Sequence, residues 1–250
     1  MIVNVDVKNL EGCVFADLAK DKTMIKEISE KQDLHSNNQR DFNLPDRVTA
    51  KRFIFKLLYG ASAYGFANDP DFIHLGFNDK KWQAVIDSFY AKYYGGAAWH
   101  KRIINEAQTT GRLTIPSGRY FPFTPIKKPD GNYATNRDGS FKWPITQIKN
   151  YPVQGFGADL VMLARLEAKK LLDEANLEAK LIGSIHDSIV ADCPAADVSI
   201  TASILLKAVE SVPRLVKQIW NYDFSLPLTA EVQGGPNKYD MQELEFQATA

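Results

Sequence analysis

Cysteine is scarce in this sequence, with two residues among 250, Cys13 and Cys193. Two cysteines so far apart build no disulfide framework and match no zinc-ligand spacing. Such sparing use of cysteine is typical of proteins kept in a reducing compartment. We therefore expect a cytoplasmic protein.

Long apolar runs and an excess of charge of one sign are also absent from the sequence. No stretch approaches the roughly 18 apolar residues of a membrane-spanning helix, so we expect no membrane contact. The opening MIVNVDVKNLEGC carries acids where a signal peptide has a basic and then an apolar region. The 30 basic and 30 acidic residues cancel. This balance excludes a uniformly basic nucleic-acid-binding protein, so any anion site must be a local patch.

The residues that are present, 45% hydrophobic and 24% charged, are typical of a globular protein with a sizeable core. Alternating apolar residues predict a strand at IVNVDV, and LPLTAEVQGG is typical of a last strand. Two β-rich runs flank His186 and Asp187 and predict a hairpin with these residues at its turn. Helices mixed with antiparallel-looking strands indicate an α+β fold. We also expect helices over 11–31, 78–109, 156–181 and 196–220, the second of these with a break at Gly95-Gly96. A further helix should begin at about Asn43, which is a candidate for its N-cap. The remaining segments are a loop over 33–46 and hairpins over 116–139.

The segment RVTAKRFIFKLLYG repeats a basic or aromatic residue every four positions: Arg47, Lys51, Phe55 and Tyr59. Steps of four place these side chains on one broad face of a helix. The two cations fall in the first turns, where the helix N-terminus already favours anions, so a polyphosphate suits this end. The aromatic rings further along offer faces for a base or a sugar. On spacing alone, an amphipathic surface helix with solvated cations remains an alternative.

Asp6 lies in the first predicted strand and Asp187 at the tip of the predicted hairpin. Two carboxylates on adjacent strand ends can share two Mg²⁺ ions roughly 4 Å apart, an arrangement that suits in-line phosphoryl transfer. Either aspartate alone is weak evidence, because a strand-end aspartate is more often a turn or cap residue. Together with a polyphosphate-binding helix, the pair completes a set of parts for nucleotidyl transfer.

Six segments resemble the motifs of family A (Pol I-like) DNA polymerases, in that family's order, over residues 3–240. The segments are DVKNLE, DLH, RVTAKRFIFKLLYG, NYPVQGFGADL, IHDS and LTAEVQGGPNKYD. The resemblance implies an antiparallel palm sheet, over about 1–30 and 145–250, with a helical fingers subdomain over about 31–144. The segment NYPVQGF resembles a bacteriophage type of this family, which would place the protein in the cytoplasm of a bacterial host.

The resemblance also implies template-directed DNA synthesis, in which dNMPs are added to the 3′-OH of a primer on a primer–template DNA. It assigns the two Mg²⁺ ions to Asp6 and Asp187. It assigns the dNTP to Lys51, Arg47, His35, Phe55, Tyr59 and Glu11, with Lys51 also an acid for the leaving pyrophosphate. It assigns the minor groove and the primer end to Asn150, Gln154 and His186. Arg119 would contact the DNA backbone, although a plain surface arginine is an equal alternative.

Glu11 distinguishes two possible products. The helix motif and HDS also occur in single-subunit, phage-type RNA polymerases, and Ser188 is closer to their third motif. A glutamate at position 11, backed by Tyr59, would block the ribose 2′-OH, which is the difference between the two kinds of substrate. Phe55 also fits the DNA-making branch. The sequence therefore favours dNTPs, with an RNA polymerase-like nucleotidyltransferase as the alternative.

Two departures from the family pattern affect the prediction. Thr146 stands where an arginine often precedes the family's asparagine, although Lys149 is close. Only five residues precede Asp6, where a family A enzyme would have a thumb and usually an exonuclease domain. We therefore expect the C-terminal part of a split or truncated polymerase that works with an upstream polypeptide. The alternative is a non-catalytic DNA-binding remnant, against which the intact set of Asp6, Lys51, Tyr59 and Asp187 argues.

Overall fold

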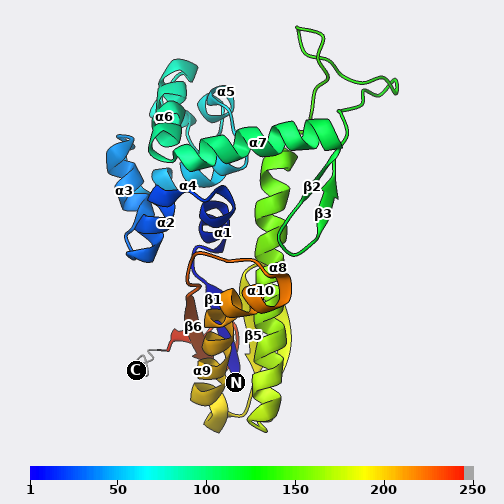
Figure 1. Ribbon diagram of the computed structural model, residues 1–250. Helices are drawn as coiled ribbons and strands as arrows, with labels where there is room; N and C mark the ends of the chain where they lie inside the picture. The colour runs from blue at the N-terminus through cyan, green and yellow to red at the C-terminus, as the bar shows by residue number, and fades with distance from the viewer. Residues whose placement is uncertain (245–250) are drawn as a thin grey trace. The chain divides into compact units, whose positions relative to one another are not determined.

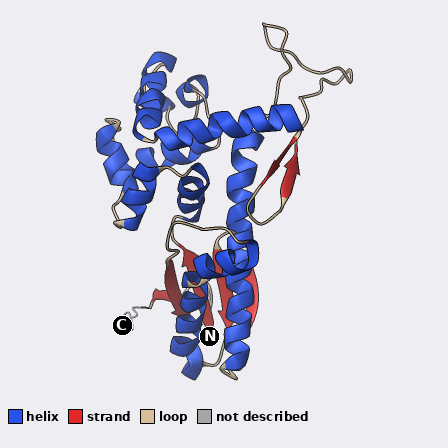
Figure 2. Ribbon diagram, in the orientation of Figure 1, coloured by secondary structure: helices blue, strands red, loops and turns tan. Residues whose placement is uncertain are grey.

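The chain has an α+β fold, and its computed structural model describes residues 1–244. Two units can be distinguished. The first unit comprises Met1–Val14 and the described chain from Gly155 onward, and the second comprises Phe15–Gln154. Figure 2 shows where the strands and helices fall along the chain. Among residues 1–244, no helix is long and apolar enough to cross a membrane.

The first unit is built on an antiparallel five-stranded sheet with the order β4-β5-β1-β6-β7. Its central strand alternates as the sequence predicts, with Val3, Val5 and Val7 buried and Asp6 half-buried. Helix α9 packs against β1 and β6 (Figure 1). The strands are β1 (Ile2–Val7), β4 (Lys180–Ile185), β5 (Ser188–Asp192), β6 (Ala230–Gly235) and β7 (Gln242–Glu243), and the helices are α9 (Val198–Glu210), α10 (Val212–Trp220) and the short η2 (Ala195–Asp197).

The hairpin predicted around His186 and Asp187 is confirmed. These two residues form the whole connection between β4 and β5, and His186 has a left-handed backbone with φ of 54°. The predicted single helix over 196–220 is wrong, because α9 and α10 are separated at Ser211. Pro213 lies in the first turn of α10, where its missing N–H costs nothing, whereas inside a continuous helix it would break the hydrogen-bond ladder.

The second unit is mostly helical, and within it α3 packs on α4 and α5 on α6 (Figure 1). Two helices, α1 and α8, have residues in both units. Helix α8 contains Pro152 and begins at Ile145, before the start that the sequence predicts at residue 156. The elements are α1 (Leu10–Ala19), α2 (Lys22–Ser29), α3 (Leu34–Asp41), α4 (Arg47–Leu58), α5 (Ala63–Ala67), η1 (Ile73–Leu75), α6 (Asp79–Lys92), α7 (Tyr94–Thr110), β2 (Arg112–Thr114), β3 (Tyr120–Pro122) and α8 (Ile145–Glu174).

A cluster of aromatic rings forms the core beneath α4. Phe53 is fully buried, and its ring stacks on Trp82 with the centroids 5.8 Å apart at 18°. Phe66 stacks on the same indole at 5.0 Å and 26°. The side of α4 that carries Phe53 and Leu57 is therefore the buried one.

We expect Phe53→Ala to lower the free energy of unfolding by about 3–5 kcal/mol, because the lost ring leaves a cavity in this cluster. Urea unfolding followed by tryptophan fluorescence measures the change. Val48→Ala is a matched control, since Val48 lies on the same helix and is 55% exposed. Its effect should stay within about 0.5 kcal/mol. Equal losses in the two variants would contradict the packing described here.

Three local predictions in the second unit are wrong. The helix over 11–31 is two helices, because Lys20 takes a left-handed backbone and the Asp21 carboxylate caps α2. The loop over 33–46 contains α3, which is capped by Asp33. Asn43, with φ of 50°, follows α3, and the N-cap of α4 is Asp46.

Gly95 and Gly96 do not interrupt the helical region as predicted. The break falls at Tyr93, and both glycines lie inside α7. A Cβ on Gly95 would lie 2.8 Å from the Cα of Asp21, and one on Gly96 would lie 2.7 Å from the Phe15 ring. The Gly96 N–H also donates to the Asp21 carboxylate at 3.1 Å. The glycines therefore allow a close approach to Phe15 and Asp21.

Candidate functional site

The first unit brings the two predicted metal-binding aspartates together. Asp6 lies opposite Ser188, the residue that follows Asp187 in the chain. The next residue of β1, Val7, donates its N–H to the carbonyl oxygen of Asp187 at 3.1 Å. The two-residue turn thus places Asp187 beside the end of β1, and both side chains are half-buried.

A third carboxylate faces Asp6 from the other side. Glu231 on β6 lies directly opposite Asp6 in the sheet, and Lys8 pairs with it at 3.2 Å. Burial raises the pKa of Asp6 above its ordinary value, and the negative charges of Asp187 and then Glu231 raise it further. The role of Glu231 was not predicted from the sequence. Its strand was predicted, but nothing in the sequence fixes which residue of β6 lies opposite Asp6.

The carboxylates of Asp6 and Asp187 fit Mg²⁺. This ion binds hard oxygen ligands and usually takes one or two protein carboxylates, with water and substrate phosphates completing its shell. The repulsion that raises the pKa of Asp6 is the interaction that a divalent cation would reverse. Within residues 1–244 no group of three or more His, Cys, Asp or Glu side chains is arranged to hold a metal ion. The remaining ligands would therefore have to come from water or substrate.

In the second unit, α4 carries the predicted cations on its exposed face. The Asp46 carboxylate accepts the Thr49 N–H at 2.8 Å and fixes the start of the helix at Arg47. Arg47 donates from Nε to the Asp33 carboxylate at 2.7 Å, which holds the pKa of Asp33 well below its usual range. This ion pair, which was not predicted from the sequence, ties α4 to the N-cap of α3. Lys51 is exposed, and no acid pairs with it among the described residues.

The first turn of α3 places His35 beside this face of α4. The His35 and Phe55 ring centroids lie 6.3 Å apart, and the Lys51 ammonium lies 6.0 Å from the Phe55 centroid. Burial lowers the pKa of His35, and the charges of Arg47 and Lys51 lower it further. Its buried Nδ1 has no hydrogen-bond partner in residues 1–244. His35, Arg47, Lys51 and Phe55, here called the α3/α4 cluster, therefore combine two cations, a neutral imidazole and a ring face.

Two further predicted nucleotide-binding residues lie outside this cluster. Tyr59 is the C-cap of α4 and is half-buried, so the helix ends at the last residue of the predicted series. Glu11 is the acidic residue in the first turn of α1, five residues after Asp6, and is also half-buried. A carboxylate near a helix N-terminus is favoured by the helix dipole.

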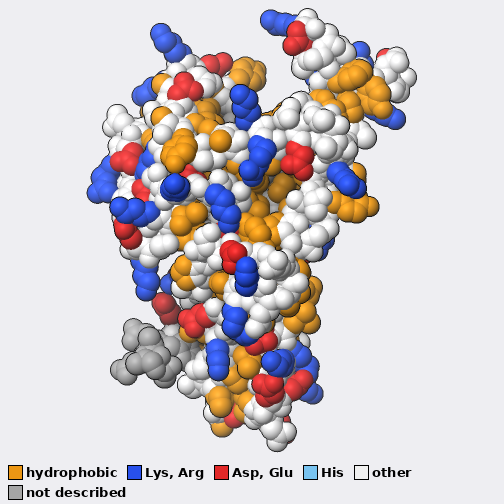
Figure 3. Space-filling model, in the orientation of Figure 1, with side chains coloured by type: hydrophobic (Ala, Val, Ile, Leu, Met, Phe, Trp, Pro, Cys, Tyr) orange, Lys and Arg blue, Asp and Glu red, His pale blue; other side chains and the backbone are white. Residues whose placement is uncertain are grey.

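The four predicted DNA-contacting residues are divided between the units. Asn150 and Gln154 lie one turn apart on α8 and so share a helix face, with Gln154 exposed. His186 is exposed at the β4–β5 turn in the first unit. Arg119 is exposed before β3, and its carbonyl accepts the Ile115 N–H at 2.9 Å. Basic and acidic side chains are interspersed on the face shown in Figure 3.

Comparisons with known proteins identify the fold and the family. A solved structure, "POL domain of Pol1 from M. smegmatis complex with DNA primer-template and dNTP", matches with a TM-score of 0.75 at 20% identity. The match covers 92% of this chain and 38% of that one. The fold is therefore that of a polymerase domain. The model of the family described as DNA polymerase family A matches residues 1–240, and the chain belongs to this family.

Curated relatives include DNA polymerase I of Bacillus subtilis, 26% identical, and that of Streptococcus pneumoniae strain R6, 25% identical. Each match covers 96% of this chain and 26% of the relative. The chain thus spans about a quarter of the length of these relatives. Both relatives are bacterial, so they lend no support to the predicted bacteriophage type.

Proposed function

We propose that this chain carries out template-directed DNA synthesis, adding dNMPs from dNTPs to the 3′-OH of a primer. The observation that carries the proposal is the position of Asp187, in the β4–β5 turn, beside the end of β1 that carries Asp6, in a chain that belongs to DNA polymerase family A. In this proposal the palm comprises about residues 1–30 and 145–250 and the fingers about residues 31–144, as the family resemblance implies. The bacterial DNA polymerases among its relatives support a place in the cytoplasm.

Asp6 and Asp187 would hold two Mg²⁺ ions. When bound, Mg²⁺ stabilises negative charge on phosphate oxygens and makes a coordinated hydroxyl easier to deprotonate. The raised pKa of Asp6 means that its carboxylate gains from a neighbouring cation. The Ser188 hydroxyl donates to the Ile185 carbonyl at 3.0 Å, closing the turn that carries Asp187. The sheet and its turn therefore hold the backbone of both aspartates, which limits the reorganisation needed before reaction.

The α3/α4 cluster would receive the triphosphate of the dNTP. The Lys51 ammonium is a compact charge that no acid within residues 1–244 neutralises, which suits a phosphate oxygen. As the pyrophosphate leaves, Lys51 can give it a proton from Nζ. Arg47 is oriented by Asp33 toward the same helix turn as His35. The Phe55 ring would lie against the sugar.

Sugar selection is assigned to Glu11, with Tyr59 as the aromatic residue that the family resemblance pairs with it. A filled pocket at the sugar excludes a ribose 2′-OH at little cost to a deoxyribose. On the DNA, Asn150, Gln154 and His186 would contact groove acceptors that all base pairs share, and so test shape without reading sequence. Arg119 would contact a backbone phosphate.

Lys51→Met should slow primer extension by about 100-fold or more and raise the KM for dNTP, because one cation on the triphosphate is lost. Steady-state kinetics on a primed template measure both parameters. Arg52→Met is a matched control, since Arg52 is the next residue on α4 and pairs instead with Asp71 at 3.2 Å. Its kinetics should stay near the wild-type values. Equal losses in both variants would mean that the helix, and not the Lys51 charge, matters.

We also propose that a firm grip on duplex DNA comes from polypeptide outside these 250 residues, as the greater length of the relatives suggests. It could be supplied by a separate upstream polypeptide, as in a split polymerase. Mg²⁺-dependent primer extension by the chain, alone and with that polypeptide, tests the proposed function. Addition of dNMPs in template order supports it, and no addition in either sample contradicts it.

A further inference from the structure

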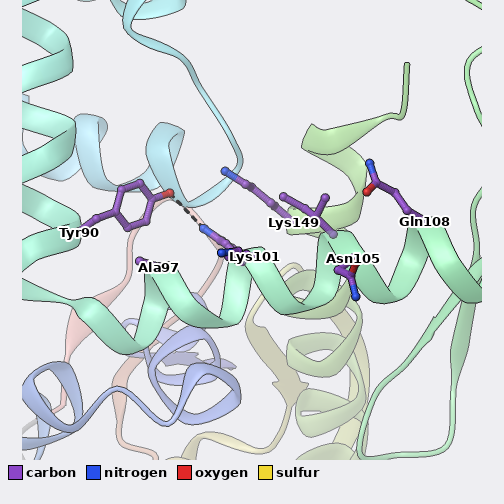
Figure 4. Close-up of a pocket in the computed structure, with 8 residues that line it drawn as sticks. Tyr90, Ala97, Lys101, Asn105, Gln108 and Lys149 are labelled. Carbon is purple, nitrogen blue, oxygen red and sulfur yellow. Dashed lines mark hydrogen bonds between the residues drawn. The ribbon is translucent and has the colours of Figure 1, made fainter. Parts of the chain in front are cut away.

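A hollow of about 570 Å³ opens in the second unit, apart from the residues assigned to dNTP or DNA (Figure 4). It is lined by α6, α7 and the start of α8. This volume is within the range of small-molecule sites. The polar residues that line it are Tyr90, His100, Lys101, Asn105, Gln108 and Lys149.

His100 contributes a buried polar group to this pocket. It is 4% exposed, and its Nδ1 lies 3.0 Å from the Tyr90 hydroxyl. Burial lowers the pKa of His100 to about 3 and raises the pKa of Tyr90 to about 12, so both are neutral at neutral pH. When Tyr90 donates to Nδ1, the ring proton lies on Nε2. This atom is buried and has no hydrogen-bond partner in the described chain, which is costly.

Lys149 adds a half-buried cation that no acid of the described chain neutralises. Figure 4 shows its side chain leaving α8 with the amino end turned toward the Tyr90 side of the pocket. Burial lowers the pKa of Lys149, and its charge helps to lower the pKa of His100, so the two groups are electrostatic neighbours. Within residues 1–244 no ion pair to Lys149 is formed, and the lining residues include no Asp or Glu. A buried charge without a counter-charge is unfavourable.

The other walls determine the kind of ligand that would fit. Lys101 brings a second cation, and the amides of Asn105 and Gln108 offer both donors and acceptors. Ala97, Ile104 and the Tyr90 ring supply apolar surface. Positive charge, neutral hydrogen-bonding groups and apolar surface together suit a molecule with an anionic end and a flat or aliphatic body.

We propose that this pocket binds a small organic anion, a phosphate or carboxylate with an apolar body, whose charged end pairs with Lys149. Free phosphate esters and the phosphates of DNA share this chemistry. Half-burial of Lys149 and the concave walls favour the small molecule, because a duplex backbone meets exposed cations more readily. The proposal does not depend on the polymerase function, since none of the residues assigned to that function lines the pocket.

Pyridoxal 5′-phosphate is a suitable probe, because it carries an aromatic ring, a phosphate and an aldehyde. A neutral lysine amine adds to the aldehyde, water leaves to give an imine, and borohydride reduces the imine to a stable secondary amine. Peptide mapping then locates the label on the full chain. At neutral pH we expect Lys149 to be labelled about tenfold faster than the exposed Lys80, because the pocket would hold the phosphate of the probe and so keep the aldehyde close to this amine. Inorganic phosphate or dAMP should protect Lys149.

Three outcomes would overturn the proposal. Lys149 could react no faster than Lys80, or pyridoxal without its phosphate could label Lys149 equally well. Alternatively, primer–template DNA could protect Lys149 while inorganic phosphate and dAMP do not, which would make the site a DNA contact. Lys101→Met keeps the labelled amine and removes the second cation. It should weaken phosphate protection while circular dichroism and primer extension stay unchanged, which separates this pocket from the proposed polymerase site.

Discussion

Asp187→Asn should reduce Mg²⁺-dependent primer extension by about 10³-fold or more, because it removes one of the two carboxylates assigned to the metal ions. Asparagine keeps the shape of the side chain and can still occupy the two-residue turn after His186. The turn and the sheet should therefore persist, and the loss should fall on catalysis. Single-turnover extension of a labelled primer, with Mg²⁺ in excess, measures the effect.

Asp192→Asn is the matched control for this variant. Asp192 is on the same strand as Ser188, is exposed, and pairs with the chain's N-terminal ammonium at 3.3 Å. An exposed pair of this kind contributes little, so extension should stay within about twofold of wild type. Extension that survives Asp187→Asn would contradict the two-metal assignment. A comparable loss in Asp192→Asn would show that charge on β5 acts on folding instead.

Glu11→Ala should lower the preference for dNTPs over rNTPs by about 10²-fold or more, because the space closed by the glutamate becomes available to a 2′-OH. The change in preference should come mainly from a higher kcat/KM for rNTPs, and the incorporation of dNTPs should be less affected. Single-nucleotide incorporation of dCTP and CTP opposite a template guanine gives the ratio directly.

Glu210→Ala is the control for Glu11→Ala, since Glu210 is an exposed glutamate at the end of α9 in the first unit. Its preference ratio should match wild type. If the native activity were RNA synthesis, as Ser188 in the third motif allows, the wild-type chain would already use rNTPs well. Glu11→Ala would then leave the ratio unchanged, and the assignment of Glu11 would fail.

The parts of the fold that the sequence predicts are those set by local pattern. Period-two alternation placed β1, and the two apolar runs around His186 and Asp187 placed the hairpin. The four-residue spacing on α4 separated its exposed cations from the buried Phe53. In each case a single element carries its own signal, because one face must be buried and the other is not.

The parts that could not be predicted depend on contacts between distant segments. Glu231 meets Asp6 only through the register of β6 on β1, and a shift of one residue would turn it away. Gly96 looked like a helix breaker, but it gives Phe15 room to approach. Asn43 and Asp46 are both good N-cap residues, and the choice between them followed from where α3 ends. The Arg47–Asp33 ion pair likewise required α3 and α4 to be packed together.

The most direct test of the central claim is primer extension by the purified chain with Mg²⁺ and the four dNTPs, with and without the polypeptide encoded immediately upstream. The account predicts that dNMPs are added in template order, at the least when that polypeptide is present. EDTA should abolish this addition, and the Asp187→Asn variant should not support it. No extension in either sample, with DNA binding intact and unaffected by Asp6→Ala or Lys51→Ala, would contradict it. The chain would then be a DNA-binding module with the motifs of a polymerase and no catalytic role.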